Sequence, residues 1–403
     1  MKVPFSPPRI DDIVIKEVTD ALQSGWITTG PRTKEFEKRI AAYCDIPHVV
    51  CVNSASAGLE LILRWYGVGP GDEVIIPAYT YAATANVVMH CGATPIMIDA
   101  EDDFNISALK IKKAITPKTK VIIPVDIAGF PCDYDLINAL VHEPEIQKMF
   151  IPATEEQEKL GRILVLADAA HSIGAVYKDK KSGKLTDISI FSFHAVKNLT
   201  TAEGGAICLN LPQVFDTEEV YKSLCIKSLH GQTKDALSKM QIGNWKYDIV
   251  EAGYKCNMTD VLAAIGLVEL ERYETDMLPK RKQIFDAYSN AFKQYDQFII
   301  PPYETREKIS SYHVYLLRIK NISEAERDEI MQRIFEQEVA VNVHFVPLPM
   351  FSFYKNLGYD IHDYPLAYKN FAAEISLPVY YDLSEKQVKI VIESVLKAVG
   401  IQK

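Results

Sequence analysis

A single lysine, Lys197, stands among apolar and small residues in the stretch FSFHAVKNLTTAEGG, residues 191–205. A lysine amine must lose its proton before it can attack a carbonyl group, and burial beside apolar groups lowers its pKa. Gly204 and Gly205 follow, where the absence of a side chain lets the backbone approach a ligand closely. The stretch is therefore a candidate nucleophilic site, although a lone buried lysine is more commonly a salt-bridged structural residue.

A carboxylate, Asp168, ends the apolar run RILVLAD at residues 162–168. Burying a carboxylate is costly unless it is paired. The ring nitrogen of pyridoxal 5'-phosphate (PLP) is a partner that such an acid would keep protonated, which makes the ring an electron sink. The alternative is that Asp168 simply caps the following segment, AAHSIGA.

Small residues that could bind the phosphate of PLP follow the apolar run HVVCVN. Ala55 and Ser56 lie at an expected helix start, and a helix N-terminus favours a phosphate dianion. Ser192 is placed to reach the same phosphate. The alternative for this helix start is ordinary capping by Ser54 or Asn53.

An aromatic residue, Tyr81, follows the apolar run GDEVIIP. Its ring could stack on the pyridine ring of the cofactor, or it could pack between a helix and the sheet. The residue type by itself leaves both interpretations open.

Positioning these side chains requires a sheet whose strands end at one edge. The predicted strands are 48–53, 71–77, 94–99, 119–125, 162–168, 187–193 and 204–210, and the predicted helices include 33–44, 56–67, 80–92 and 106–115. This alternation predicts an α/β fold, a mostly parallel seven-stranded sheet sandwiched by helices. Ligands of such sheets bind at the carboxyl ends of the strands. The polar segment 142–162 is expected to be a helix extension plus a surface insertion.

The second part of the chain has a different pattern. Residues 257–292 predict two long helices, and a smaller α+β unit follows. We expect a large domain over 1–275, with an N-terminal arm over about 1–30, and a small C-terminal α+β domain over 276–403.

Composition and charge exclude several classes of function. The net charge of −9 disfavours a nucleic-acid partner, and no apolar run is long enough to predict a membrane span. Seven cysteines and the lack of an apolar leader predict reduced thiols in the cytoplasm. Cys44, His48 and Cys51 lack a second ligand pair, so we expect no metal site. A generic nucleotide-binding protein would need a G-x-G-x-x-G turn or a P-loop lysine, and neither motif is present.

Six segments resemble the DegT/DnrJ/StrS family of sugar aminotransferases. They are GWITTGPRTKEFE, GDEVIIPAYTYAATANVVMHCGATPIMID, LADAAHSIGA, FSFHAVKNLTTAEGGAI, GYKCNMTDVLAAIGLVEL and VNVHFVPLPMFSFY. The resemblance covers nearly the whole chain and implies a PLP enzyme of fold type I, the fold of aspartate aminotransferase.

The resemblance implies a role for each candidate residue. Lys197 matches the lysine that bonds the cofactor aldehyde, and Asp168 matches the acid on the ring nitrogen. His171 matches a position near the ring 3-hydroxyl, Tyr81 the stacking aromatic residue, and Ala55, Ser56 and Ser192 the phosphate site. Asn257 matches an asparagine that reaches the phosphate from a neighbouring subunit, which implies a homodimer with shared active sites.

The function implied by the resemblance is transfer of an amino group from an amino acid, L-glutamate, to a nucleotide-linked keto-sugar. A 4-keto-6-deoxyhexose bound for surface polysaccharide or glycan is the expected acceptor. Such a substrate carries a pyrophosphate, for which one or two basic residues are expected to provide charge. The candidates are Lys222, Lys227, His230, Lys234, Lys239, Lys246 and Lys255.

Two positions depart from the family pattern, and two other functions remain open. Ala167 replaces an acidic residue, and Asp126 in PVDIAG replaces a histidine, which puts the polarity of the substrate side in question. A PLP-dependent sugar dehydratase of this family would carry histidine in place of Lys197. A catalytically silent regulator or scaffold is the other alternative, although the lysine, the acid and the phosphate site are all retained.

Overall fold

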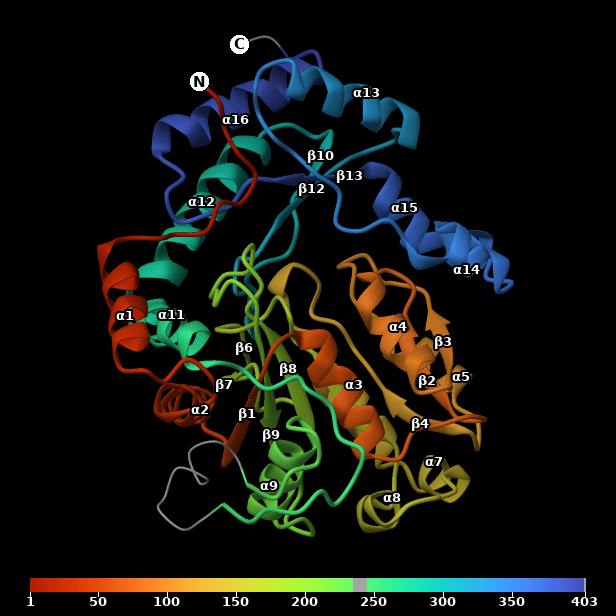
Figure 1. Cartoon of the computed structure of the whole chain (residues 1–403). Coiled ribbons are helices and arrows are strands. Elements are labelled where there is room, and N and C mark those ends of the chain that lie inside the picture. Colours follow the sequence, from red (N-terminus) through yellow and green to blue (C-terminus); the bar gives the residue numbers. More distant parts are fainter. Residues whose placement is uncertain (235–244, 402–403) are drawn as a thin grey trace.

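A seven-stranded sheet forms the centre of the larger part of the chain in the computed structural model, which describes residues 1–234 and 245–401 (Figure 1). The strand order is β1-β9-β8-β5-β4-β2-β3. The strands are β1 (His48–Val52), β2 (Glu73–Pro77), β3 (Thr94–Ile98), β4 (Thr119–Ile122), β5 (Leu164–Asp168), β8 (Ile188–Ser192) and β9 (Gly205–Leu209). Only β9 is antiparallel to its neighbours, β1 and β8, so the predicted mostly parallel sheet is confirmed.

Helices cover both faces of this sheet, as its apolar strands require. Val50 and Val52 of β1 belong to the core that includes residues of α3 (Ala55–Trp65), whereas Val49 and Cys51 belong to the core that includes residues of α2. Further helices of this part include α2 (Pro31–Cys44), α4 (Ala82–His90), α5 (Ala108–Ala114), α6 (Tyr134–Val141), α9 (Thr217–Lys227) and α11 (Asp260–Glu271).

Segment 142–162 forms two short helices, α7 (Pro144–Met149) and α8 (Glu155–Leu160). The expected helix extension is therefore wrong, because α6 ends at Val141 and Pro144 starts a new helix, a position where the missing proline N–H costs nothing. The segment is also attached to the core, since buried Gln157 donates a hydrogen bond to the carbonyl oxygen of Tyr66 over 2.8 Å.

The C-terminal part surrounds a three-stranded antiparallel sheet, β10-β12-β13, at the top of Figure 1. Its strands are β10 (Phe298–Ile299), β12 (Tyr315–Ile319) and β13 (Glu374–Leu377), and its helices are α12 (Leu278–Phe292), α13 (Glu324–Phe335), α14 (Ser352–Asn356), α15 (Pro365–Ala373) and α16 (Glu385–Ala398). One turn of π-helix, Tyr273–Met277, joins α11 to α12, and the expected domain boundary near residue 275 falls within it. Residues 339–345 make isolated bridges instead of a strand.

The N-terminal arm contains a helix and reaches both parts of the molecule. Helix α1 (Asp12–Gln23) packs against α11, and Val3 pairs with Val339. A third small sheet, β11-β6-β7, consists of β11 (Lys308–Ile309), β6 (Val176–Tyr177) and β7 (Lys180–Lys181). Within the described ranges, no helix has the length and apolar character needed to cross a membrane.

Candidate active site

Neighbouring strands β5 and β8 bring Asp168 and the lysine loop to the same edge of the sheet. Asp168 is the last residue of β5 and pairs with Ile190 of β8, two residues before that strand ends at Ser192. A tight turn follows, in which the N–H of Lys197 donates to the carbonyl oxygen of His194 over 2.8 Å. The two residues that the sequence placed at strand ends therefore face each other closely enough for their charges to interact.

Lys197 is a half-buried amine without a fixed partner. Burial lowers its pKa to about 8, and the charge of Asp168 opposes this shift only partly. In the part of the chain that the structure describes, its ammonium group makes no hydrogen bond or ion pair. About half of such a lysine is neutral at pH 8, so it can act as a nucleophile near neutral pH.

Asp168 is held by a threonine of α4. The Thr84 hydroxyl donates to Asp168 Oδ2 over 2.9 Å, and the N–H of Ala170 donates to Oδ1 over 3.3 Å. Burial raises the pKa of Asp168, and these donors together with the charge of Lys197 oppose the increase. The bond to Ala170 corresponds to the capping alternative, which the structure therefore shows, and the other carboxyl oxygen is held by Thr84. Thr84 was missed, because nothing in a lone helical threonine indicates a partner far along the chain.

Three imidazoles surround the lysine loop. The His171 ring lies 4.3 Å from the His313 ring and 5.7 Å from the Phe345 ring, measured between centroids. Burial, and then nearby charges including that of Lys197, lower the pKa of His171, His313 and His344, so all three rings are neutral. Nδ1 of His171 is buried with no hydrogen-bond partner among the described residues, which fits a ligand atom at this position. Of the three, only His171 was predicted.

The phosphate end of the predicted site lies where α3 begins. Ser54 caps this helix by accepting a hydrogen bond from the N–H of Ala57 over 3.1 Å, so the capping alternative is realised, while Ser56 is exposed. A Cβ built at Gly205 would lie 2.6 Å from the nitrogen of Ala55, and Gly205 pairs with Ser192. Ala55 and Ser192 are thus close neighbours across a glycine that no larger residue could replace.

Tyr81 immediately precedes α4 and is 65% exposed. Its ring lies 6.0 Å from the ring of Phe345. The alternative that Tyr81 packs between helix and sheet is therefore wrong, and its ring is available to contact a ligand.

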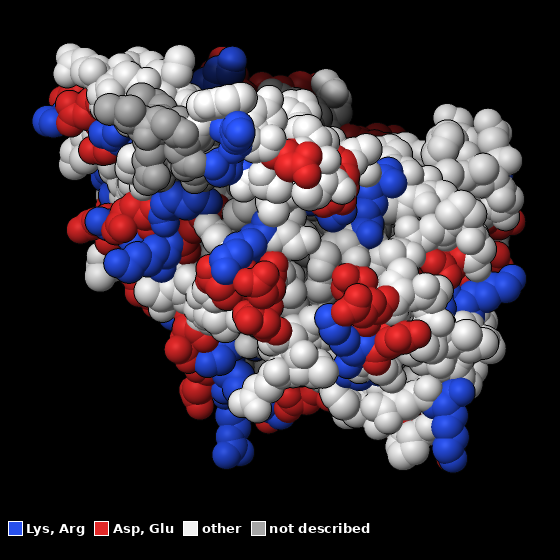
Figure 2. All heavy atoms as spheres, turned by 60° about the horizontal axis from the view of Figure 1, so that its bottom comes forward, with Lys and Arg blue, Asp and Glu red and all other residues white. Residues whose placement is uncertain are grey.

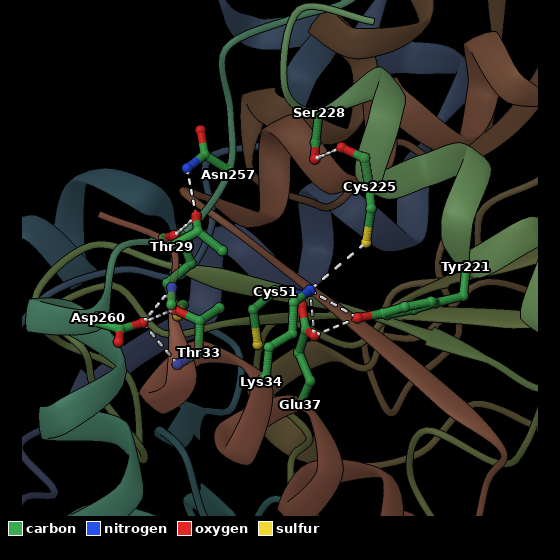
Figure 3. A network of polar contacts seen from close by, with 12 residues as sticks. Thr29, Thr33, Lys34, Glu37, Cys51, Tyr221, Cys225, Ser228, Asn257 and Asp260 are labelled. Carbon is green, nitrogen blue, oxygen red and sulfur yellow. Dashed lines mark hydrogen bonds and ion pairs between the residues drawn. The ribbon is translucent and has the colours of Figure 1, made fainter. Parts of the chain in front are cut away.

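Asn257 lies beside the end of β1, in the polar network of Figure 3. Its side-chain amide donates to the hydroxyl of Thr29 over 2.6 Å, and it bridges to Val52. Asp260, three residues later, accepts hydrogen bonds from the backbone at the start of α2, including the N–H of Gly30 over 2.7 Å. The segment that carries Asn257 is therefore tied firmly to the start of α2.

The same figure shows a second group of contacts that joins α2, β1 and α9. The ammonium of Lys34 bonds the Glu37 carboxylate over 3.0 Å and the Tyr221 hydroxyl over 2.7 Å, and Glu37 accepts the N–H of Cys51 over 2.9 Å (Figure 3). Cys44 and Cys51 are buried in the core, and the described residues contain no cluster of ligands for a metal ion.

Asp126 lies in the interior next to Asp168, whose carbonyl oxygen accepts the N–H of Asp126 over 3.3 Å. It is fully buried and accepts hydrogen bonds from Ser172 Oγ (2.6 Å), the Tyr134 hydroxyl (2.7 Å) and the N–H of Cys132 (2.9 Å). Burial raises its pKa, which these donors oppose. The carboxyl oxygens of Asp126 are therefore already satisfied inside the protein, which argues against a direct effect of this residue on the polarity of the substrate side.

Two of the basic residues expected near a pyrophosphate have carboxylate partners. Lys222 pairs with Glu219 over 2.9 Å, and Lys227 pairs with Glu251. Lys239 lies outside the described residues. The face in Figure 2 likewise shows positive and negative side chains intermixed.

Taken together, the doubly covered sheet and the weakly basic lysine opposite a buried carboxylate define a class, the PLP-dependent aminotransferases of fold type I. Within this class, the chain belongs to the DegT/DnrJ/EryC1/StrS aminotransferase family, whose model matches residues 8–396.

Similar proteins agree with this assignment. Spr1654 of Streptococcus pneumoniae, which carries the provisional assignment of a sugar aminotransferase, is 48% identical with a TM-score of 0.94 over 98% of both chains in its PMP form, and it is also solved in a PLP form. The spore coat polysaccharide biosynthesis protein SpsC of Bacillus subtilis is 36% identical over 98% of this chain and 96% of its own. PseC of Helicobacter pylori, an aminotransferase involved in pseudoaminic acid biosynthesis, is 26% identical with a TM-score of 0.84 over 99% of both chains. The protein is a PLP-dependent sugar aminotransferase.

Proposed function

We propose that the protein moves an amino group from L-glutamate to the keto group of a nucleotide-linked sugar, a 4-keto-6-deoxyhexose, for surface polysaccharide or glycan synthesis. The observation that carries the proposal is Lys197, an amine with a pKa of about 8 opposite buried Asp168. The similarity to SpsC supports polysaccharide synthesis as the destination of the product.

PLP, when bound, supplies an aldehyde and an electron-withdrawing ring. In the proposed site, Asp168 holds the ring nitrogen, His171 lies near the 3-hydroxyl group and Tyr81 stacks on the ring. Ala55, Ser56 and Ser192 hold the phosphate. The unpartnered Nδ1 of His171 and the close packing at Gly205 support this placement.

Lys197 has two roles in the proposed reaction. Its neutral amine would condense with the cofactor aldehyde, whose oxygen would leave as water, and the amine of the incoming amino acid would then take its place and release Lys197. The released amine then carries a proton between the α-carbon of the amino acid and the C4' carbon of the cofactor, first as a base and then as an acid. Asp168 stays ionised against the ring nitrogen throughout.

The proposed active unit is a homodimer in which Asn257 reaches the phosphate of the neighbouring subunit. Large apolar side chains exposed on the described surface support an interface between copies, because such groups usually mark contact sites. They are Ile10, Ile13, Ile15, Leu22 and Ile27 near the N-terminus, and Trp245, Tyr247, Ile249 and Val250. One or two basic residues of 222–255 would meet the substrate pyrophosphate.

The absorption spectrum of the bound cofactor tests the proposed reaction. Protein loaded with PLP should be yellow, its visible band should shift with L-glutamate, and the band should return when a keto-sugar nucleotide is added. A panel of such nucleotides, with mass and NMR analysis of the product, would identify the acceptor. A visible band that does not shift with any amino donor would contradict the proposal.

The lysine assignment is tested by Lys197→Ala. We expect this variant to bind PLP without a borohydride-trapped adduct and to lose at least about 10³-fold in turnover, because the nucleophile and the proton carrier are the same group. The matched control is Lys180→Ala, which removes an exposed lysine of β7 and should trap normally. Trapping at another lysine would show that the assignment is wrong.

A further inference from the structure

A chain of three hydrogen-bonded side chains leads from the active site into the C-terminal part. Nδ1 of His344 lies 2.9 Å from Ser376 Oγ, and Ser376 Oγ lies 2.6 Å from Glu374 Oε1. The other carboxyl oxygen, Oε2, accepts the N–H of His344 over 3.1 Å. Glu374 and Ser376 are fully buried on β13, so this chain links a carboxyl group in the interior to an imidazole at the site.

Among the described residues, no cation pairs directly with Glu374. The charges of Arg318 of β12 and Arg327 of α13 act on it from farther away, and its charge acts in turn on the hydroxyl of Tyr79. Arg327 Nη1 donates to the carbonyl oxygens of Phe371 and Glu374, and in the described part of the chain neither arginine forms an ion pair with the Glu374 carboxylate. Burial therefore raises the pKa of Glu374 to about 8, since its donors and the two distant arginines compensate only partly.

The imidazole of His344 lies on the lysine side of the site. It lines a small cavity together with Phe5, His313 and Val196, the residue before Lys197, and its ring stacks on Phe5 at 5.5 Å. Burial and the charge of Lys197 lower its pKa to about 4, so the ring is neutral and carries one proton. Nε2 has no hydrogen-bond partner in the described ranges, which leaves this nitrogen open to a ligand.

The direction of the hydrogen bonds decides where that one proton lies. If Glu374 is a carboxylate, Ser376 must donate to it and accept from Nδ1–H, which leaves Nε2 bare. If Glu374 is a carboxylic acid, it can donate to Ser376 Oγ, whose own proton then points to Nδ1, and the imidazole proton lies on Nε2.

We propose that Glu374 is a positioning residue that determines, through Ser376, whether His344 offers the site a hydrogen-bond donor or an acceptor. A change from acceptor to donor is balanced by one proton that enters at Nε2. The Nδ1 proton moves to Ser376 Oγ, and the serine proton moves to Glu374 Oε1. No proton has to cross the apolar interior by another route.

The expected ligand chemistry follows from the sign of the pKa shift. Below about pH 8 Glu374 is neutral and Nε2 carries the proton; above it Nε2 is bare. At neutral pH His344 would therefore donate to a carbonyl, hydroxyl or carboxylate oxygen of a substrate. This last step rests on the proposed function, whereas the location of the proton does not.

The test is nitrogen NMR of the full-length protein labelled with ¹⁵N-histidine, without substrates. Resonances of His344 are identified by their loss in His344→Gln. Between about pH 6 and pH 10 we expect the proton to move from Nε2 to Nδ1 with a midpoint near 8. Lys197 titrates in the same range, so Lys197→Ala is the matched control and should keep the transition.

Two variants distinguish proton transfer along the His344–Ser376–Glu374 chain from general effects of pH. Glu374→Gln is isosteric with the acid form, can donate to Ser376 at any pH and should keep the proton on Nε2 throughout. Ser376→Ala removes the hydroxyl that links Glu374 to His344 and should also abolish the transition. It provides a second test if one variant fails to fold. A wild-type tautomer that does not change with pH, a transition that survives Glu374→Gln, or one that disappears in Lys197→Ala would overturn the proposal. None of these outcomes depends on aminotransferase turnover, so failure of the proposed function would be distinguishable.

Discussion

The pKa of an individual residue in the proposed site depends on which charged neighbours it has and which it does not. Lys227 pairs with the Glu251 carboxylate, and Lys184 pairs with the Asp45 carboxylate. Lys197 instead faces Asp168 at a distance and neutral imidazoles nearby, so its ammonium gains too little to offset burial. This balance gives a partly neutral amine near pH 8 without any special covalent chemistry.

At the residue scale, Thr84→Val tests how Asp168 is held. The substitution keeps the shape but removes a hydrogen bond to a carboxylate, worth about 1.5–3 kcal/mol. The pKa of Asp168 should rise further, the ionised form should become a weaker partner for the ring nitrogen, and the dissociation constant for PLP should increase about 10- to 100-fold. Spectroscopic titration with PLP measures this.

A matched control for this substitution is Thr186→Val. Thr186 is also buried, and its hydroxyl donates to the carbonyl oxygen of Ile188 over 2.8 Å at the start of β8, away from the site. The control should cost stability without weakening cofactor binding. Equal losses of PLP affinity in both variants would show that Thr84 acts only on the fold.

Several helices and strands pack in direct contact near the proposed site, and this packing positions its residues. Strand β9 runs between β1 and β8, and Gly205 at its start packs against the first residues of α3. The close approach lets the N-terminus of α3 and the end of β8 face one ligand. The antiparallel strand thus brings together the two segments to which the proposed phosphate site belongs.

At the element scale, Gly205→Ala should disrupt this approach. The new Cβ would lie 2.6 Å from the nitrogen of Ala55 and 2.9 Å from the carbonyl oxygen of Phe191, both backbone atoms that cannot move aside. We expect a loss of about 1–3 kcal/mol in the free energy of unfolding and weaker PLP retention. Thermal unfolding with and without PLP measures both.

Gly69→Ala is the matched control, because a Cβ there meets nothing within 4 Å. It should leave both stability and cofactor retention nearly unchanged. If Gly205→Ala behaved like Gly69→Ala, the helix start would have more room than this packing allows.

At the scale of the whole molecule, the proposal that Asn257 reaches a neighbouring subunit depends on where its segment lies. Asn257 lies on a segment anchored by Thr29 and Asp260, and exposed apolar side chains occur in the N-terminal region and after residue 244. A single chain therefore leaves apolar surface uncovered, which a second copy would bury.

At the scale of the assembly, mixing two impaired variants tests whether sites are shared. Lys197→Ala and Asn257→Ala should each be weakly active at limiting PLP. After unfolding and joint refolding, hybrid dimers would contain one site with both native residues, so activity should recover to about a quarter of wild type. If Asn257 acts within its own chain, mixing would give no recovery, and the proposal of shared sites would be wrong.

The order of chemistry-bearing residues could be predicted from the sequence, because apolar strand patterns are local and parallel strands end at one edge. Lys197, Asp168 and the small residues after β1 were predicted as site residues in this way, and the family, which is confirmed, followed from the motifs around them. Tyr81 remained ambiguous until its exposure was seen. The break at Pro144 was missed, although a proline is a local signal.

The sequence by itself determined the cofactor class and the sheet and pointed to Lys197 as the candidate nucleophile, since short contiguous patterns carry each of these signals. Only the tertiary structure decided which groups adjust that chemistry. Thr84 meets Asp168 across 84 residues, His344 meets Ser376 across 32, and Asp126 turned out to be buried with both carboxyl oxygens hydrogen-bonded. Such contacts depend on packing between elements distant in the chain, and the pKa of a buried group depends on those contacts more than on its own residue type.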